Sequence, residues 1–342
     1  MPVPLHPLTR ELLSWYRKNA RDLPWRAAPE PYSTWLSEVI LQQTRVAQGT
    51  AYWERFLAAF PTVTDLAAAP TEEVMSLWKG LGYYSRARNL HLAAQRIVSE
   101  RNGALPVKAA EWAALPGIGP YTAAAIASIC HGEAVPVIDG NVQRVISRLF
   151  DIENPVDRKT GRKAIEAFCA ELVAVEAPGD SNQGWMELGA LVCTPKSPDC
   201  AHCPLADACL ARERGTQMQR PVKQPKKAPQ EVDVRFWIPM RKDPSGHWEW
   251  WVETRPEKGI WSQLEAFPCE MGPKSDRTHP GAFGPVQHIL THRRMTAWFN
   301  AGEEQQVKSG NGRWIDVEHG EANWPRIIDK VLPELREWIV KN

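Results

Sequence analysis

The sequence has no long uninterrupted apolar run and almost no net charge. None of its apolar segments reaches the roughly 18 residues that a membrane-spanning helix needs, and residues 1–10 lack the hydrophobic core of a signal peptide. A formal net charge of +1 over 342 residues neither requires nor excludes a nucleic-acid partner, which would have to meet local basic surfaces. We therefore expect a bacterial cytoplasmic protein that binds no membrane.

Cysteine is scarce, and its few copies are unevenly placed. Of seven cysteines, Cys193, Cys200, Cys203 and Cys209 fall in one short segment with the spacing C-x6-C-x2-C-x5-C. Without an export signal, this crowding favours a metal or cluster site over disulfide bonds. Thiolates suit either zinc or an iron–sulfur cluster, and the spacing alone does not choose between them.

The chain changes character near residue 212, which indicates two domains. Before that point, apolar residues recur with helical spacing and Pro and Gly interrupt at short intervals. We predict an all-α domain over 1–212, built from a six-helix module at about 29–134 and a second module formed by 1–28 with 135–212. The stretch 213–230, rich in Pro, Gln and Lys, is expected to be an extended linker.

The last part of the chain has the pattern of an α+β domain, at 231–342. Val232, Val234, Phe236 and Ile238 alternate with other residues, as in a half-buried strand. From Trp324 to Ile339 the apolar residues form one long helical stripe.

A short glycine-containing turn lies at 115–122, with the sequence L-P-G-I-G-P-Y-T. Gly117 and Gly119 flank one apolar residue and precede a helix-forming run. Glycines permit a tight turn that a large ligand can approach, and the N-terminus of the following helix can offer its N–H groups to a phosphate. On its own, this motif is equally compatible with a plain helix–helix turn.

The cysteine quartet, this turn and Asp139 together resemble the helix-hairpin-helix DNA glycosylases of the endonuclease III superfamily. Three blocks, Trp35–Thr44, Gly80–Asn89 and Ile138–Arg144, are similar to adenine DNA glycosylases of the MutY family, and the similarity extends over about 23–209. The resemblance implies a monomeric enzyme that excises adenine mispaired with 8-oxoguanine, or with guanine, from double-stranded DNA. It also implies a [4Fe–4S] cluster on the four cysteines.

The resemblance implies catalytic roles for four residues. Glu38 is expected to protonate adenine at N7, since burial on an apolar helical segment keeps a carboxyl neutral. Asp139 is expected to stabilise the oxocarbenium-like sugar as an ionised carboxylate, through a transient covalent acetal. Tyr121 would order both carboxylates, and Asn141 would place water or the sugar. From the residues alone, Glu38 could also be an exposed helix residue and Asp139 only a helix N-cap.

Strand-nicking members of the superfamily use a lysine amine in the helix after the hairpin, which forms a Schiff base with the sugar. Tyr121 occupies that position here, after Pro120. We therefore predict a glycosylase without lysine-based lyase activity.

The remaining contacts implied by the resemblance concern DNA. The flipped adenine would meet Trp25, Arg26 and Gln183. Expected DNA contacts are Gln43, Thr44 and Tyr83 beside the lesion, with Gln43 and Tyr83 as wedges, the backbone of Gly117 and Gly119 on a phosphate, and Arg86, Arg88, Arg144 and Lys196 on other phosphates.

The C-terminal part resembles the Nudix-like domain with which adenine glycosylases recognise oxidised guanine. It has no Nudix box of spaced glutamates, so pyrophosphate hydrolysis is not supported. The family's Phe-Ser-His recognition loop is best matched by Leu290-Thr291-His292. Thr291 keeps a hydroxyl and is expected, with His292, to contact the lesion, whereas Leu290 lacks the aromatic ring.

Two other functions are compatible with parts of this pattern. One is a thymine- or uracil-mismatch glycosylase of the same fold, against which Glu38 in its Gln-Gln-Thr context argues. The other is a non-catalytic DNA-damage binding protein or iron–sulfur regulator, which would be expected to lack Glu38 or Asp139.

Overall fold

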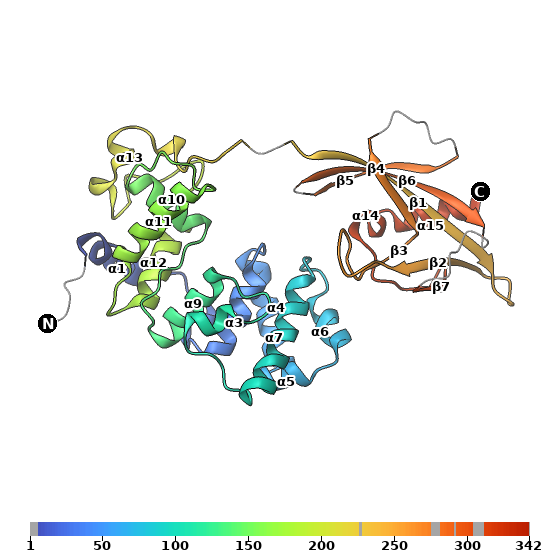
Figure 1. Ribbon diagram of the computed structural model, residues 1–342, viewed down its shortest axis with the longest axis horizontal. Coiled ribbons are helices and arrows are strands. Elements are labelled where there is room, and N and C mark those ends of the chain that lie inside the picture. Colours follow the sequence, from blue (N-terminus) through green and yellow to red (C-terminus); the bar gives the residue numbers. More distant parts are fainter. Residues whose placement is uncertain (1–5, 226–227, 275–280, 291, 304–310, 342) are drawn as a thin grey trace. The chain divides into compact units, whose positions relative to one another are not determined.

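The computed structural model describes residues 6–225, 228–274, 281–290, 292–303 and 311–341. By its internal contacts the chain divides into two compact units, Met1–Gln224 and Pro225–Asn342, and Figure 1 shows one as helical and the other as built on a sheet. In the described part of the chain, no helix is both long and apolar enough to cross a membrane.

The first helical module surrounds a core that contains the fully buried Trp35, Trp78 and Trp112. Proline is the first residue of both α3 and α9, where its missing N–H costs no intrahelical bond. The module consists of α3 (Pro31–Leu41), α4 (Val46–Ala59), α5 (Val63–Ala68), α6 (Thr71–Trp78), α7 (Ser85–Arg101), α8 (Ala109–Ala113) and α9 (Pro120–His131).

The second module has its own core, which includes Leu12, Ile146 and Leu188. Its N-terminal helix is held to a distant segment by the Thr9 hydroxyl, which donates to the carbonyl of Leu172 at 2.8 Å. The module consists of α1 (Pro7–Asn19), α2 (Pro24–Ala27), α10 (Gly140–Leu149), α11 (Lys159–Leu172), α12 (Pro178–Leu191), α13 (Leu210–Glu213) and the 3-10 turns η1 (Ala206–Ala208) and η2 (Gln217–Gln219).

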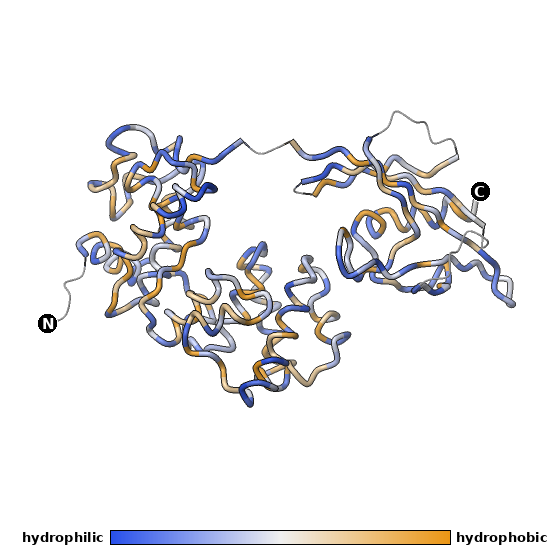
Figure 2. The backbone as a smooth tube through the Cα atoms, in the orientation of Figure 1, coloured by the Kyte–Doolittle hydropathy of each residue, from blue (hydrophilic) through white to orange (hydrophobic). Residues whose placement is uncertain are grey.

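By its contacts the segment 213–224, the first part of the expected linker 213–230, belongs to the helical unit. Arg220 is buried and its Nε lies 2.8 Å from a carboxylate oxygen of Asp151. The backbone N–H of Val156 also donates to the carbonyl of Val222 at 3.0 Å. Ion pairs and backbone hydrogen bonds hold this hydrophilic stretch to the helical unit (Figure 2). Neither kind of contact produces a periodic pattern of apolar residues, so neither can be recognised in the sequence.

The second unit contains a seven-stranded mixed sheet of order β3-β2-β1-β6-β5, with β4 paired to β1 and β7 to β2. Only the pair β1–β6 is parallel among these ladders, with Val232 opposite Met295. The alternation read from the sequence is the buried face of β1. The strands are β1 (Gln230–Lys242), β2 (Trp248–Thr254), β3 (Glu265–Ala266), β4 (Cys269–Pro273), β5 (Phe283–Leu290), β6 (Arg293–Glu303) and β7 (Gly312–Asp316).

Two helices, α14 (Arg326–Asp329) and α15 (Leu332–Lys341), pack against the sheet and share its core through Ile328 and Leu335. The sequence predicted one continuous apolar stripe here, and the structure breaks it between the two helices. Pro333 has no N–H to donate to the preceding turn, so α14 cannot continue into α15.

Candidate active site

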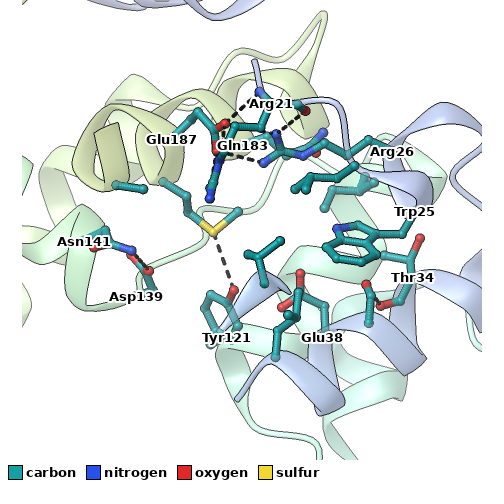
Figure 3. Close-up of a pocket in the computed structure, with 17 residues that line it drawn as sticks. Arg21, Trp25, Arg26, Thr34, Glu38, Tyr121, Asp139, Asn141, Gln183 and Glu187 are labelled. Atoms are coloured by element: carbon teal, nitrogen blue, oxygen red, sulfur yellow. Dashed lines mark hydrogen bonds and ion pairs between the residues drawn. The ribbon is translucent and has the colours of Figure 1, made fainter. Parts of the chain in front are cut away.

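A pocket of about 200 Å³ lies in the helical unit, where α3 and α9 face α10 and α12. It is smaller than the sites of drug-sized ligands, which are about 300–1,000 Å³. The pocket brings together all four expected catalytic residues and all three expected adenine contacts (Figure 3). These residues are Trp25, Arg26, Glu38, Tyr121, Asp139, Asn141 and Gln183.

Glu38 lies on α3 and faces the pocket, while its neighbours Leu36, Val39 and Ile40 are buried in the core. Burial raises the pKa of its carboxyl from 4.5 to about 7, although a hydrogen bond from Tyr121 lowers it. Both the protonated and the ionised form are therefore accessible near neutral pH. It can act as a general acid or, once deprotonated, as a base.

Asp139 is both a pocket residue and the N-cap of α10. Its carboxylate accepts hydrogen bonds from the backbone N–H of Val142 at 2.7 Å and from the side-chain amide of Asn141 at 2.8 Å. Burial raises the pKa of Asp139, and both hydrogen bonds lower it. The capping role and a catalytic role are thus compatible in one side chain, since the helix N-terminus also favours the ionised carboxylate.

Arg144, which the sequence suggested as a phosphate contact, holds Asn141 from the side opposite Asp139. Its Nη2 donates to Asn141 Oδ1 and to the carbonyl of Gly189, each at 2.8 Å. Its Nε donates to the carbonyl of Cys193, also at 2.8 Å. A Cβ at Gly189 would lie 2.6 Å from Asn141 Cβ, so this glycine permits the close approach of α12.

Tyr121, the second residue of α9, lies beside Glu38 in Figure 3. Its hydroxyl lies 3.5 Å from the sulfur of Met186 and hydrogen bonds with Glu38. Burial raises the pKa of the phenol, so it stays neutral and can order the Glu38 carboxyl.

Sequence reasoning missed an ion-pair network across the pocket from Glu38. Glu187 on α12 is buried and accepts hydrogen bonds from the Arg21 guanidinium at 2.8 Å and from Arg26 Nη2 at 3.0 Å. Burial alone would raise the pKa of Glu187, but these bonds lower it to about 2. The available signal was its position four residues after Gln183, which puts both on one helical face.

The expected wedge residues lie in two loops outside the pocket lining. Gln43 follows α3 and Tyr83 precedes α7, and both are exposed. Both also have positive φ, 61° and 48°, which is uncommon for residues other than glycine. Thr44 closes the first loop by donating its N–H to the carbonyl of Leu41 at 3.2 Å. Arg86, expected on a phosphate, donates instead to backbone carbonyls of the protein.

The two glycines of the hairpin turn differ in backbone conformation and in surroundings. Gly117 has φ +73° and a Cβ there would lie 2.5 Å from Asn89 Cβ, whereas Ile118 is buried. Gly119 precedes α9 and has no atom within 4 Å of a Cβ position. Gly117 is therefore required by conformation and packing, while Gly119 leaves the N-terminus of α9 open to an approaching group.

The four cysteines of the quartet form no disulfide and are half-buried on the second module. The thiols influence one another electrostatically, since the other three raise the pKa of Cys203, after burial as the main cause. Arg148 Nη1 donates to the sulfur of Cys193 at 3.3 Å. Among the residues described, no group of three or more His, Cys, Asp or Glu side chains is arranged around one ion position. Lys196 is exposed on the same loop.

In the sheet unit, the structure describes two of the three residues matched to the lesion-recognition loop, Leu290 and His292. Leu290 ends β5, and Thr291 lies outside the described residues. His292 is exposed, and its carbonyl accepts a hydrogen bond from the N–H of Gln230 at 3.0 Å.

The helical unit, with two carboxyl groups in one pocket, belongs to a known class of protein. Residues 36–173 match the family model of the HhH-GPD superfamily base excision DNA repair proteins. Of the solved structures with a similar fold, a thermostable thymine-DNA glycosylase has a TM-score of 0.57 and 26% identity, over 60% of this chain and 95% of that one. A non-covalent endonuclease III–DNA complex has a TM-score of 0.53 at 23% identity, over 61% and 95% of the two chains, which shows the fold alone.

Curated relatives narrow the class further. The adenine DNA glycosylase of Buchnera aphidicola subsp. Schizaphis graminum is 34% identical over 258 residues, covering 75% of this chain and 73% of the relative. The human adenine DNA glycosylase is 46% identical over 217 residues, covering 61% of this chain and 40% of the human protein. The matched part therefore spans less than half of the human relative's length. The chain belongs to the adenine DNA glycosylase family.

Proposed function

We propose that the protein is a monomeric DNA repair glycosylase that excises adenine mispaired with 8-oxoguanine, or with guanine, from double-stranded DNA. One observation carries the proposal: Glu38, with a pKa of about 7, and Asp139 line the same small pocket. Cleavage of a glycosidic bond requires two carboxyl groups in different surroundings. One is protonated and acts as the acid, and the other is ionised and stabilises the charge on the sugar.

The reaction begins when adenine leaves the duplex and enters the pocket. Glu38 donates its proton to N7, so that the protonated adenine accepts the electrons of the breaking C1′–N9 bond and leaves as a neutral base. Asp139 stabilises the positive charge that develops on the sugar and bonds to C1′ through one carboxylate oxygen. Water then attacks C1′, Glu38 takes the proton from that water, and Asp139 is released as a carboxylate. Asn141 and Tyr121 keep the two carboxyl groups oriented.

Recognition of the base is assigned to the opposite wall of the pocket. Glu187 already accepts hydrogen bonds from Arg21 and Arg26. The side-chain amide oxygen of Gln183, by contrast, can accept one from the exocyclic amino group of adenine. Arg26 and Gln183 offer further polar groups, and the indole of Trp25 offers an apolar wall. Thymine and uracil carry no exocyclic amino group, so this wall favours adenine over the substrates of mismatch glycosylases.

The enzyme is proposed to act without lysine-based strand cleavage. Tyr121 stands where a lyase would need an amine, and a phenol cannot form a Schiff base with the sugar. The product is therefore an abasic site in an intact strand.

The quartet of cysteines is proposed to hold a [4Fe–4S] cluster. Four disulfide-free thiols, one of them (Cys193) beside the Arg148 guanidinium, suit such a group, because a cationic donor stabilises a coordinating thiolate. When bound, the cluster supplies a rigid, redox-active cross-link for the loop that carries Lys196. Iron content and a visible absorbance band test this assignment, and a stoichiometric zinc content would contradict it.

The sheet unit is proposed to be a Nudix-like domain that recognises the oxidised guanine through Thr291 and His292. Its mixed sheet with two packed helices and the exposed His292 between β5 and β6 support this role.

One assay tests the proposal and separates the alternatives. Duplexes with A opposite 8-oxoguanine, A·G, T·G and U·G are incubated with the protein and then treated with alkali. We expect strand breaks at adenine in the first two duplexes, only after alkali. Breaks at thymine or uracil would instead indicate a mismatch glycosylase, and binding without breaks a damage-recognition protein. Glu38→Gln serves as the control that binds but does not cleave.

A further inference from the structure

A single guanidinium, that of Arg86 on α7, joins the two loops that carry Gln43 and Tyr83. One side of it caps the C-terminal end of α3, and the other side contacts the loop before α7. Nη1 donates to the carbonyls of Val39 at 2.9 Å, of Ile40 at 3.0 Å and of Gln42, and Nη2 lies 3.3 Å from the carbonyls of Leu81 and Gly82. Few other arrangements would satisfy these carbonyls at once, since only arginine offers a rigid fork of donors.

Aromatic rings hold the same guanidinium in place. Arg86 Cζ lies 5.0 Å from the centroid of the Trp78 ring and 5.7 Å from that of Tyr83. The indole N–H of Trp78 donates to the carbonyl of Gly82 at 3.0 Å, so the loop before α7 is fixed to the core as well. The Arg86 side chain itself is half-buried.

The two loops need such support because each contains a strained residue. Gln43 and Tyr83 have φ values of 61° and 48°, and Tyr83 is 63% exposed. Non-glycine residues keep this conformation only where the surrounding structure enforces it. Arg86 bonds to the residue before Gln43 and to the residue before Tyr83, so one side chain sets both conformations.

We infer that Arg86 is a positioning residue that fixes Gln43 and Tyr83 at the spacing needed to unstack DNA beside the target base. The same fork binds the last turn of α3, on which Glu38 lies, and so couples the wedge to the acid. This inference rests on the proposed function, which assigns Gln43 and Tyr83 to DNA.

The test follows base extrusion separately from bond cleavage. All proteins carry Glu38→Gln, and the duplex has 2-aminopurine next to the target adenine, so that unstacking raises its fluorescence without any cleavage. Arg86→Lys keeps the charge but cannot reach both loops, and we expect its fluorescence change at saturating protein to be about fivefold smaller. Glu100→Gln, on the exposed face of the same helix, weakens only the ion pair with Arg96 and should leave the change intact.

The outcomes separate the two proposals. If the parent protein neither binds the duplex nor changes its fluorescence, the proposed function fails. If the parent responds and folded Arg86→Lys gives the same saturated change, the positioning role of Arg86 is overturned, because reduced stability alone would not alter that amplitude. Should Arg86→Lys not fold, Gly82→Ala strains the same loop at φ +68° without a clash. It is expected to reduce the fluorescence change, and a full change would again overturn the inference.

Discussion

The side-chain amide of Asn141 donates a hydrogen bond to Oδ2 of Asp139 at 2.8 Å. Its orientation is fixed, because Arg144 has only donors and binds the carbonyl oxygen of the same amide at 2.8 Å. Hydrogen bonding to the ionised form lowers the pKa of Asp139, against burial, which raises it. Asn141 therefore helps to set the lower pH limit at which Asp139 is a carboxylate.

Replacing Asn141 with Ala should narrow the pH range of activity from the acid side. The hydrogen bond from Asn141 favours the ionised form, so the pKa of Asp139 should rise when it is removed. Single-turnover excision rates between pH 4.5 and 8 measure the shift of the acid limb. Asn19→Ala, at the exposed end of α1, is the control. An acid limb that does not move would show that Asn141 does not tune Asp139.

Glu38→Gln should abolish excision and yet stabilise the fold at high pH. The folded pKa of Glu38, about 7, lies above its ordinary 4.5, so the unfolded chain releases this proton first as the pH rises. The folded state loses stability between these two values, and above pH 7 the loss reaches about 3 kcal/mol. Glutamine cannot ionise, so the Glu38→Gln variant does not lose this stability as the pH rises. Urea unfolding at pH 5 and pH 8 should show the larger gain at pH 8, and a gain independent of pH would contradict the assignment.

Glu187→Gln should have the opposite effect on stability. The folded pKa of Glu187, about 2, lies below its ordinary value, so its contribution is present above pH 4.5 and lost as the pH falls through 2. At pH 7 the variant should be less stable by about 3 kcal/mol, and the difference from wild type should shrink below pH 4. Release of Arg21 and Arg26 should also slow excision. Equal unfolding curves at pH 7 would argue against the network.

The two hairpin glycines offer a matched pair of variants. Gly117→Ala places a side chain at φ +73° against Asn89, which should cost about 1–2 kcal/mol from the backbone alone. Gly119→Ala meets no atom within 4 Å and should leave the melting temperature unchanged. If the N-terminus of α9 binds a phosphate, Gly119→Ala should still weaken DNA binding. Unchanged affinity for duplex DNA would exclude a phosphate at this turn.

The sequence indicated several residues that line the pocket, but not the side chains that hold them in place. Leu36, Val39 and Ile40 form a visible apolar period around Glu38, and the blocks around Asp139 and Tyr121 follow a family pattern. The supporting contacts of Arg86 and Arg144 could not be predicted, because their acceptors include backbone carbonyls that only the folded chain brings near. Glu187 was missed for a similar reason, since Arg21 and Arg26 reach it from more than 150 residues away.

The two C-terminal helices show a second limit of predicting helices from apolar periodicity. A continuous apolar stripe from Trp324 to Ile339 predicted one helix, yet the stripe continues across a break that Pro333 imposes. Burial preferences fix which residues face the core, whereas hydrogen-bonding capacity decides where a helix ends.

The pairing of Arg220 with Asp151 decides where the catalytic unit can be separated from the rest of the chain. Asp151 is buried, and its carboxylate depends on Arg214, Thr216 and Arg220 for compensation. A fragment truncated at residue 212 would remove Arg214, Thr216 and Arg220 and leave this buried carboxylate without them. A fragment that extends to residue 224 retains them all, and is the shorter piece suited to crystallisation with DNA.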